Sequence, residues 1–274
     1  MFREKLESAA KRNGSLLCVG LDPDPARLPI ESVGEFNRAI IEATADLVCA
    51  YKPNLAFYEA LGEAGYAALR ETLAAIPPHI PTIADAKRGD IGNTARAYAS
   101  AVFDVLGFDA VTVSPYLGGD SLAPFIERED RGVFVLCRTS NPGAADFQDL
   151  AVSSEKGVRP LYEVVAERAR SWNSRGNVGL VTGATYPEEL GRVRELCPDM
   201  LLLIPGVGAQ AGDLAAAVRE GLDARGGGIL VVAARGVLYA SRGEDFARAA
   251  RGAAESLRDQ IQQEREAAPA KGGS

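Results

Sequence analysis

Residues 82–113, TIADAKRGDIGNTARAYASAVFDVLGFDAVTV, contain the pattern that decides the fold. The stretch begins with a short apolar run from Thr82 and ends with a second run, rich in β-branched residues, from Ala110. Between them, residues 95–106 carry apolar side chains at helical spacing. Short apolar strands that flank a helix are typical of parallel strands covered on both faces. The stretch therefore predicts one strand–helix unit and the strand that opens the next.

The same unit repeats along the chain. Six further apolar runs begin near Ser15, Leu47, Gly132, Val178, Leu201 and Ile229. A second clear helical stretch covers residues 161–172, and the strands recur about every 31 residues, which suits eight βα units in one domain. A doubly wound open sheet could carry this pattern, but eight evenly spaced units favour closure. We therefore expect an α/β fold, a (βα)8 TIM barrel.

No linker divides the 274 residues, so we expect one barrel domain over residues 1–266. The fifth unit, which starts at Gly132, is the longest, and its excess near 141–159 is rich in Gly, Ala, Ser and Asp. This composition predicts an extended loop on the active face. The final residues, 267–274 (AAPAKGGS), are expected to form a disordered tail.

Composition excludes several classes of function. The formal net charge is −7 and no basic tract is present, which argues against a nucleic acid or an anionic membrane as partner. No apolar stretch approaches the roughly 18 residues of a membrane span. The charged N-terminus, MFREKL, lacks the apolar core of a signal peptide. These features predict a protein of the cytoplasm.

The cysteines and the histidine narrow the chemistry further. Four cysteines show no C-x-x-C spacing, and three of them lie in apolar, strand-like runs. We interpret them as buried reduced thiols rather than as disulfides or a metal site. The only histidine, His79, lies in a proline-rich loop. A serine–histidine hydrolase and a multi-histidine zinc centre are therefore disfavoured.

Charged side chains of both signs follow the first three predicted strands, where the active site of such a barrel lies. They are Asp22, Lys52, Asp85 and Lys87. Residues i and i+2 of a strand share a face, so Asp85 and Lys87 should project together. The alternative is an internal ion pair, with Asp90 capping the next helix. Alone, Lys52 could reach solvent at the barrel rim, but beside this cluster we expect it to join the site.

A phosphate site is predicted at the loops after the last two strands. Residues 204–213, IPGVGAQAGD, contain three glycines that let backbone N–H groups approach an anion. Arg235 follows the eighth strand, and its guanidinium complements phosphate oxygens. These two loops recurrently bind phosphate in such barrels. The alternative is a tight turn without a ligand, but glycines together with Gln210 and Arg235 favour phosphate.

At this point the residues match a known pattern. DAKRGDIGNT, residues 85–94, resembles the D-x-K-x-x-D-I-x-x-T signature of orotidine 5′-phosphate decarboxylases. Other motifs follow in the family's order: GLDPD (20–24), YKPN (51–54), TSNPGA (139–144), PGVGAQ (205–210) and ARG (234–236). Residues 51–62 and the long fifth unit are most similar to the longer bacterial subgroup. In the last motif, Ala234 stands where many members have glycine.

The resemblance implies decarboxylation of orotidine 5′-phosphate to uridine 5′-phosphate, the last step of de novo pyrimidine synthesis. It implies no cofactor and no metal. Lys87 would protonate C6 of the pyrimidine, stabilising the carbanion electrostatically before donating its proton. Asp85 would lie beside the departing carboxylate. Lys52 would contact Asp85 and a ribose hydroxyl.

The remaining roles are implied in the same way. Asp22 would bind ribose. Ser140 and Pro205 would contact the base, and Gln210 with Arg235 would hold the phosphate. Asp90 and Thr94 would serve the site of the neighbouring subunit, which implies a homodimer.

Two alternatives stay open. Metal-dependent sugar-phosphate decarboxylases and synthases on the same scaffold are similar in this signature, but they need an acidic ligand near the end of the second strand. This chain has Lys52 there, and a cation disfavours Mg²⁺. A non-catalytic phosphate-binding barrel would explain Gln210 and Arg235, but not the row of mixed charges.

Overall fold

The computed structural model describes residues 1–154, 157–207 and 213–268. Eight parallel strands form its centre. They are β1 (Leu17–Leu21), β2 (Ala50–Pro53), β3 (Ile83–Arg88), β4 (Ala110–Val113), β5 (Gly132–Arg138), β8 (Val178–Thr182), β9 (Leu202–Pro205) and β10 (Ile229–Ala233). Each lies within or beside a run expected from the sequence.

The sheet closes into a barrel. Its strand order is β2-β1-β10-β9-β8-β5-β4-β3, with every neighbouring pair parallel. Parallel bridges between Tyr51 and Thr82 and between Asn54 and Asp85 join the two outermost strands, β2 and β3. The predicted TIM barrel is therefore confirmed, and the open-sheet alternative is wrong.

The strands are almost continuously apolar because both of their faces are buried. Alternate side chains point into the barrel and form an inner core that includes Cys18, Ile83, Phe134 and Val232. The side chains between them point outward and pack against the helices in a larger core. The charged side chains that the barrel strands carry lie near the C-terminal ends of those strands: Lys52, Asp85, Lys87, Arg88 and Arg138.

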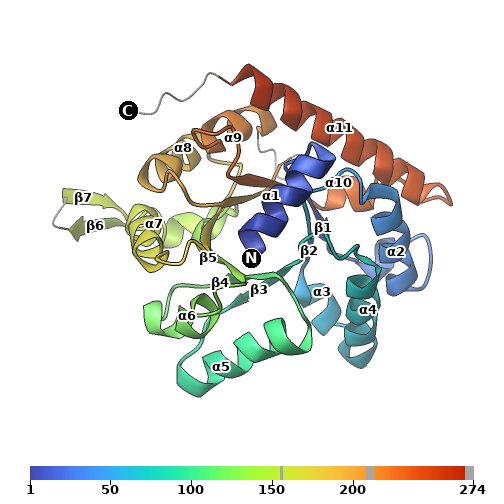
Figure 1. Ribbon diagram of the computed structural model, residues 1–274, viewed down its shortest axis with the longest axis horizontal. Coiled ribbons are helices and arrows are strands. Elements are labelled where there is room, and N and C mark those ends of the chain that lie inside the picture. Colours follow the sequence, from blue (N-terminus) through green and yellow to red (C-terminus); the bar gives the residue numbers. More distant parts are fainter. Residues whose placement is uncertain (155–156, 208–212, 269–274) are drawn as a thin grey trace.

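Helices surround the strands (Figure 1). They are α1 (Phe2–Asn13), α2 (Val33–Thr44), α3 (Leu55–Glu59), α4 (Gly62–Ala75), α5 (Gly92–Ser100), α6 (Gly119–Ile126), α7 (Leu161–Trp172), α8 (Pro187–Leu196), α9 (Leu214–Gly221), α10 (Arg235–Leu238) and α11 (Phe246–Ala267). Short turns of 3-10 helix, η1 (Pro25–Arg27) and η3 (Pro142–Asp146), and of π-helix, η2 (Ala101–Val105), complete the set. The helix expected over 95–106 consists of α5 and η2, and α7 coincides with the second expected helix.

Helix α1 lies across the N-terminal end of the barrel (Figure 1). Phe2 and Leu6 pack into the inner core, and the Phe2 ring meets Phe134 edge-on at 5.9 Å. Gly132 makes this possible, because a Cβ there would lie 2.3 Å from the Phe2 ring. The N-terminal end of the barrel is thus plugged by apolar side chains.

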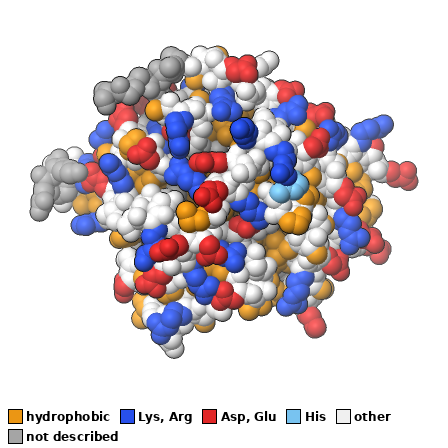
Figure 2. Space-filling model, in the orientation of Figure 1, with side chains coloured by type: hydrophobic (Ala, Val, Ile, Leu, Met, Phe, Trp, Pro, Cys, Tyr) orange, Lys and Arg blue, Asp and Glu red, His pale blue; other side chains and the backbone are white. Residues whose placement is uncertain are grey.

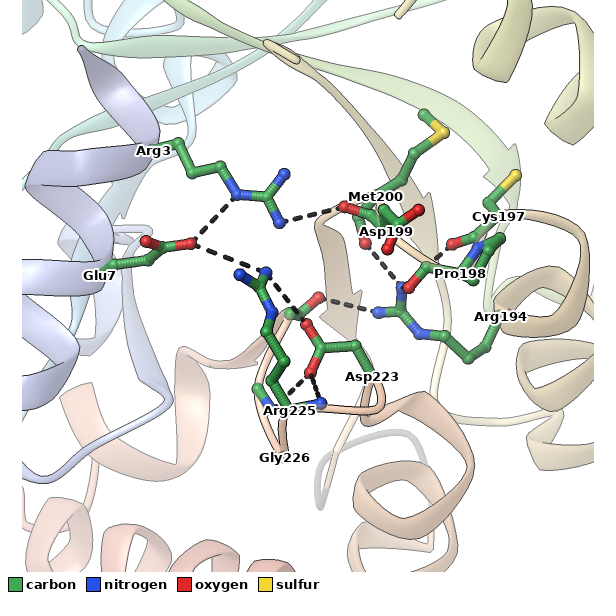
Figure 3. Close-up of polar contacts among 12 residues, drawn as sticks. Arg3, Glu7, Arg194, Cys197, Pro198, Asp199, Met200, Asp223, Arg225 and Gly226 are labelled. Carbon is green, nitrogen blue, oxygen red and sulfur yellow. Dashed lines mark hydrogen bonds and ion pairs between the residues drawn. The ribbon is translucent and has the colours of Figure 1, made fainter. Parts of the chain in front are cut away.

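Polar contacts hold the turns around this plugged end (Figure 3). The buried guanidinium of Arg194 donates to backbone carbonyl oxygens of Cys197, Pro198, Met200, Gly221 and Gly228. Arg225 lies between Asp223, at 3.6 Å, and Glu7 of α1, at 4.0 Å. These charges have their partners at this end, so they serve the packing of the fold.

The fifth unit is more regular than its composition indicates. The segment expected as an extended loop contains η3 and a hairpin of β6 (Ala151–Ser154) and β7 (Gly157–Pro160), which projects beyond the helices (Figure 1). These strands have only four residues each, AVSS and GVRP, and carry little apolar periodicity, so the sequence did not reveal them. Of the tail expected over 267–274, Ala267 belongs to α11, and residues 269–274 lie outside the described part of the chain.

The surface matches the composition. Acidic and basic side chains are interspersed on the face that carries α1 (Figure 2), with no broad basic area in that view. Across the described residues, no helix combines the length and apolarity needed to cross a membrane. All four cysteines are buried and free.

Candidate active site

The C-terminal ends of the strands surround a cavity of about 320 Å³. Seven of the predicted site residues line it: Asp22, Lys52, Asp85, Lys87, Ser140, Pro205 and Arg235. They come from the ends of β1, β2, β3, β5, β9 and β10. Gln210 falls outside the described residues. The closed barrel therefore brings distant motifs of the chain to one cavity, as expected.

A row of three charges crosses the cavity. Asp85 accepts hydrogen bonds from both lysines: Lys52 Nζ lies 2.7 Å from Oδ2, and Lys87 Nζ lies 2.5 Å from Oδ1. The Lys52 side chain is only 5% exposed, whereas that of Lys87 is 50% exposed. Lys52 therefore does not extend to solvent at the rim. It anchors Asp85, and Asp85 holds the accessible ammonium of Lys87.

The electrostatics of this row favour the ionised forms of Asp85 and Lys52. Burial alone would raise the pKa of Asp85, but the ammonium groups of Lys52 and Lys87 outweigh it and hold that pKa well below its usual range. Burial would lower the pKa of Lys52, yet the negative charges of Asp85 and Asp22 raise it above its ordinary value. A carboxylate and a buried ammonium therefore persist side by side at neutral pH.

Asp22 supplies a second acid at the cavity. One of its carboxylate oxygens, Oδ1, is buried and has no hydrogen-bond partner among the described residues. Burial raises the pKa of Asp22 above its usual value, although Lys52 acts in the opposite direction. The Tyr239 hydroxyl fixes the backbone here by donating to the Asp22 carbonyl oxygen at 2.9 Å. An unpaired carboxylate oxygen in a cavity is suited to accept a hydrogen bond from a ligand hydroxyl.

The opposite side of the cavity presents the loops after β9 and β10. Gly206 has a φ of 100°, a conformation that side chains disfavour, and Arg235 is the first residue of α10 with an exposed side chain. Ala234, where the family often has glycine, is accommodated by Gly20, because a Cβ at residue 20 would lie 2.8 Å from the Ala234 Cβ. The described part of this side can therefore place a guanidinium and backbone N–H groups beside an anion.

Asp90 and Thr94 do not line the cavity of their own chain. Asp90 is half-buried and accepts a hydrogen bond from the Ile91 backbone N–H at 2.8 Å. Helix α5 has Ile91 as its N-cap and no side-chain cap, so the alternative of Asp90 as the helix cap is wrong. Thr94 is exposed on the first turn of α5.

Thr112 is a cavity residue that the sequence interpretation missed. Its hydroxyl donates to Asp85 Oδ1 at 3.1 Å. The residue lies inside an apolar strand run, and only its register opposite β3 makes it part of the site. The sequence feature that could have identified Thr112 is a polar residue near the end of an otherwise apolar barrel strand.

A second group of missed residues holds the strand end that carries Ser140. Gln148 accepts from the Thr139 backbone N–H at 2.8 Å, and Thr139 Oγ1 donates to Asn141. Arg138 is 2% exposed, stacks on the Tyr186 ring at 4.0 Å and lies 3.3 Å from Asp149. Arg138 could have been identified by the criterion used for Lys52, because both are charged residues at the end of a buried strand.

The sequence of the chain was compared with models of known protein families. Residues 15–250 match the model of the orotidine 5′-phosphate decarboxylase / HUMPS family. The chain belongs to this family. The match begins just before β1 and continues into α11, so it includes every strand of the barrel.

Relatives of this family resemble the chain over nearly its whole length. An orotidine 5′-phosphate decarboxylase of Thermomicrobium roseum is 59% identical over 95% of both chains. One of Dehalococcoides mccartyi is 57% identical over 95% of this chain and 97% of the relative. The structure of Leishmania donovani OMP decarboxylase superposes with a TM-score of 0.86 at 47% identity, covering 97% of this chain and 99% of the other.

Within the orotidine 5′-phosphate decarboxylase / HUMPS family, the end of β2 separates the two chemistries considered from the sequence. The metal-dependent alternative needs an acidic ligand there, and this chain places the buried ammonium of Lys52 against Asp85. A divalent cation would have to bind beside a fixed positive charge. The site therefore fits an organic anion better than a metal ion.

Proposed function

We propose that the protein decarboxylates orotidine 5′-phosphate to uridine 5′-phosphate without a cofactor, as the last step of de novo pyrimidine synthesis. The observation that carries this proposal is the row of Lys52, Asp85 and Lys87 across a cavity that also offers Asp22 and Arg235. A non-catalytic phosphate-binding barrel would need Arg235, but it would have no use for a buried row of alternating charges.

The chemistry needs a fixed cation at C6. Loss of carbon dioxide leaves an electron pair on this ring carbon, and the ring does not delocalise it. The Lys87 ammonium stabilises that pair electrostatically and then transfers its proton to C6, while the amine is left neutral. Asp85 holds the Lys87 ammonium in place through their ion pair before the reaction, and its carboxylate would lie beside the departing carboxylate of the substrate.

The rest of the cavity binds the nucleotide away from the reacting carbon. Asp22 accepts hydrogen bonds from the ribose, and Lys52 also reaches a ribose hydroxyl. Ser140 and Pro205 contact the base, while Arg235 and Gln210 hold the phosphate. Because the phosphate is remote from C6, its binding energy serves to position the ring against Lys87.

We infer that the active form is a homodimer. Asp90 and Thr94 do not line the cavity of their own chain, and the large apolar side chain of Ile91 beside them is 60% exposed. A partner subunit that covers this apolar surface would receive Asp90 and Thr94 at its own cavity. Asp90 would then act with Asp85 to hold the Lys87 ammonium in position. We also place the protein in the cytoplasm, which fits its four free cysteines.

An ultraviolet assay tests the proposed function. We expect the purified protein, dialysed against EDTA, to consume orotidine 5′-phosphate at the same rate as protein supplied with Mg²⁺. In the proposed mechanism the positive charge at the reacting carbon comes from the Lys87 ammonium and not from a metal ion. Uridine 5′-phosphate should accumulate in equal amount. Loss of turnover in EDTA, restored by Mg²⁺, would favour the metal-dependent alternative. No decarboxylation under either condition would refute the proposal.

A further inference from the structure

The backbone that carries Lys87 leaves regular strand geometry. Ala84 pairs with Val111 and Arg88 pairs with Val113, so four steps along β3 match two steps along β4. The extra residues form a bulge. Within it, Lys87 has a φ of 48°, and it is the only non-glycine residue with positive φ in the described parts of the chain. L-residues avoid this conformation, so neighbouring groups must hold it in place.

Thr112 of β4 provides the contacts that hold the bulge. Its Oγ1 accepts hydrogen bonds from the backbone N–H groups of Ala86 and Lys87, both at 3.0 Å. The same hydroxyl donates its proton to Asp85 Oδ1 at 3.1 Å. A hydroxyl has one donor and two acceptor positions, so all three are occupied. Thr112 is 1% exposed, which leaves water no access to replace these bonds.

One hydroxyl thus fixes both ends of the Asp85–Lys87 pair. It orients the carboxylate that binds the Lys87 ammonium, and it fixes the backbone from which the Lys87 side chain extends. We propose that Thr112 is a positioning residue for proton transfer, and that it sets where Lys87 Nζ lies relative to the substrate. This inference rests on the proposed function, in which Lys87 is the proton donor.

Without this hydroxyl, two buried N–H groups would lose their acceptor. We expect the bulge to relax toward the negative φ that lysine prefers, which moves Nζ out of line with Asp85 and the ring. A displacement of about 1 Å in a reacting group lowers kcat by about 100-fold. The nucleotide's affinity should change little, because Asp22 and Arg235 follow other strands, β1 and β10.

Three variants test this role in steady-state kinetics of decarboxylation. Thr112→Val removes the hydroxyl at nearly constant volume, and we expect kcat to fall about 100-fold with KM changed less than about threefold. Thr112→Ser keeps the hydroxyl and should retain kcat within about fivefold. Thr182→Val is the matched control, because Thr182 is also buried at a strand end but its Oγ1 has no partner among the described residues. This control should keep wild-type kinetics.

The outcomes separate this inference from the function beneath it. A wild-type kcat in Thr112→Val, or equal losses in Thr112→Val and Thr112→Ser, would overturn the positioning role while wild-type turnover still supports the proposed function. An inactive wild-type protein would refute the proposed function itself. If Thr112→Val does not fold, Thr112→Cys replaces it, because a thiol is only a weak hydrogen-bond acceptor. Thr112→Cys with the kcat of Thr112→Ser would then overturn the inference.

Discussion

Replacing Lys87 with alanine should lower kcat by at least about 10⁴-fold, because in the proposed mechanism this one side chain supplies both the charge that stabilises the carbanion and the proton that quenches it. Neither Lys52, which is buried against Asp85, nor Arg235, on the far side of the cavity, can take over this role. Stopped-flow or steady-state ultraviolet assays with orotidine 5′-phosphate measure the loss of kcat.

The same variant should still fold and bind uridine 5′-phosphate. Half of the Lys87 side chain is exposed, so its removal leaves no large cavity, and the residues expected to hold ribose and phosphate remain. Lys5→Ala is the control, because it removes a lysine from an ion pair with Asp109 outside the cavity. Lys5→Ala should keep wild-type kcat. A Lys87→Ala variant with more than about 1% of wild-type kcat would show that Lys87 is not the proton donor.

The second large effect is expected for Asp85→Asn, which should impair both turnover and stability. Removing the carboxylate charge leaves the buried Lys52 ammonium without its counter-ion, at a cost of about 3 kcal/mol in the free energy of unfolding. It also releases Lys87 from its anchor, so kcat should fall by about 10³-fold or more. Chemical denaturation and the ultraviolet assay measure the two losses on one preparation.

The stability loss should depend on pH. The pKa of Asp85 is lowered in the folded protein, so its contribution is complete above the unfolded-state pKa of about 4 and declines as acid is added below it. The difference in unfolding free energy between wild type and Asp85→Asn should therefore shrink as the pH falls below about 4. Asp46→Asn, which breaks an exposed pair with Arg251, is the control and should change stability far less. Equal stability losses in the two variants would contradict the buried pair.

Much of the barrel could be predicted because burial on both faces leaves a strong signal in the strands. The runs from Ala110, Gly132, Val178 and Ile229 start at the residues where β4, β5, β8 and β10 begin. The β6–β7 hairpin was missed because it buries little apolar surface: Val158 is 72% exposed. Secondary structure that does not contribute to a core leaves a weak pattern.

The site residues also divide into those that the sequence could identify and those that it could not. Asp22, Lys52, Asp85 and Lys87 could be identified because charges are rare at the ends of buried strands. Asp85 and Lys87 do converge, but simple strand alternation is not the reason, since a bulge separates them from regular pairing. That bulge depends on a hydroxyl from the neighbouring strand, and a contact between strands cannot be inferred from the local sequence of either one.

The proposed mechanism depends on an active site built from two chains, in which the Lys87 ammonium would lie between Asp85 of its own subunit and Asp90 of the neighbouring one. Mixing two inactive variants tests this arrangement most directly. Lys87→Ala and Asp90→Ala would be dissociated together and reassembled, and the formation of mixed dimers would be verified with two affinity tags. Each mixed dimer should contain one site with both native residues.

We expect each variant alone to be nearly inactive and the equimolar mixture to regain about one quarter of the wild-type activity per chain, since half of the dimers are mixed and half of their sites are intact. If mixed dimers form and the mixture has only the average activity of the two variants, Lys87 and Asp90 do not act across the subunit boundary, and the two-chain site is contradicted.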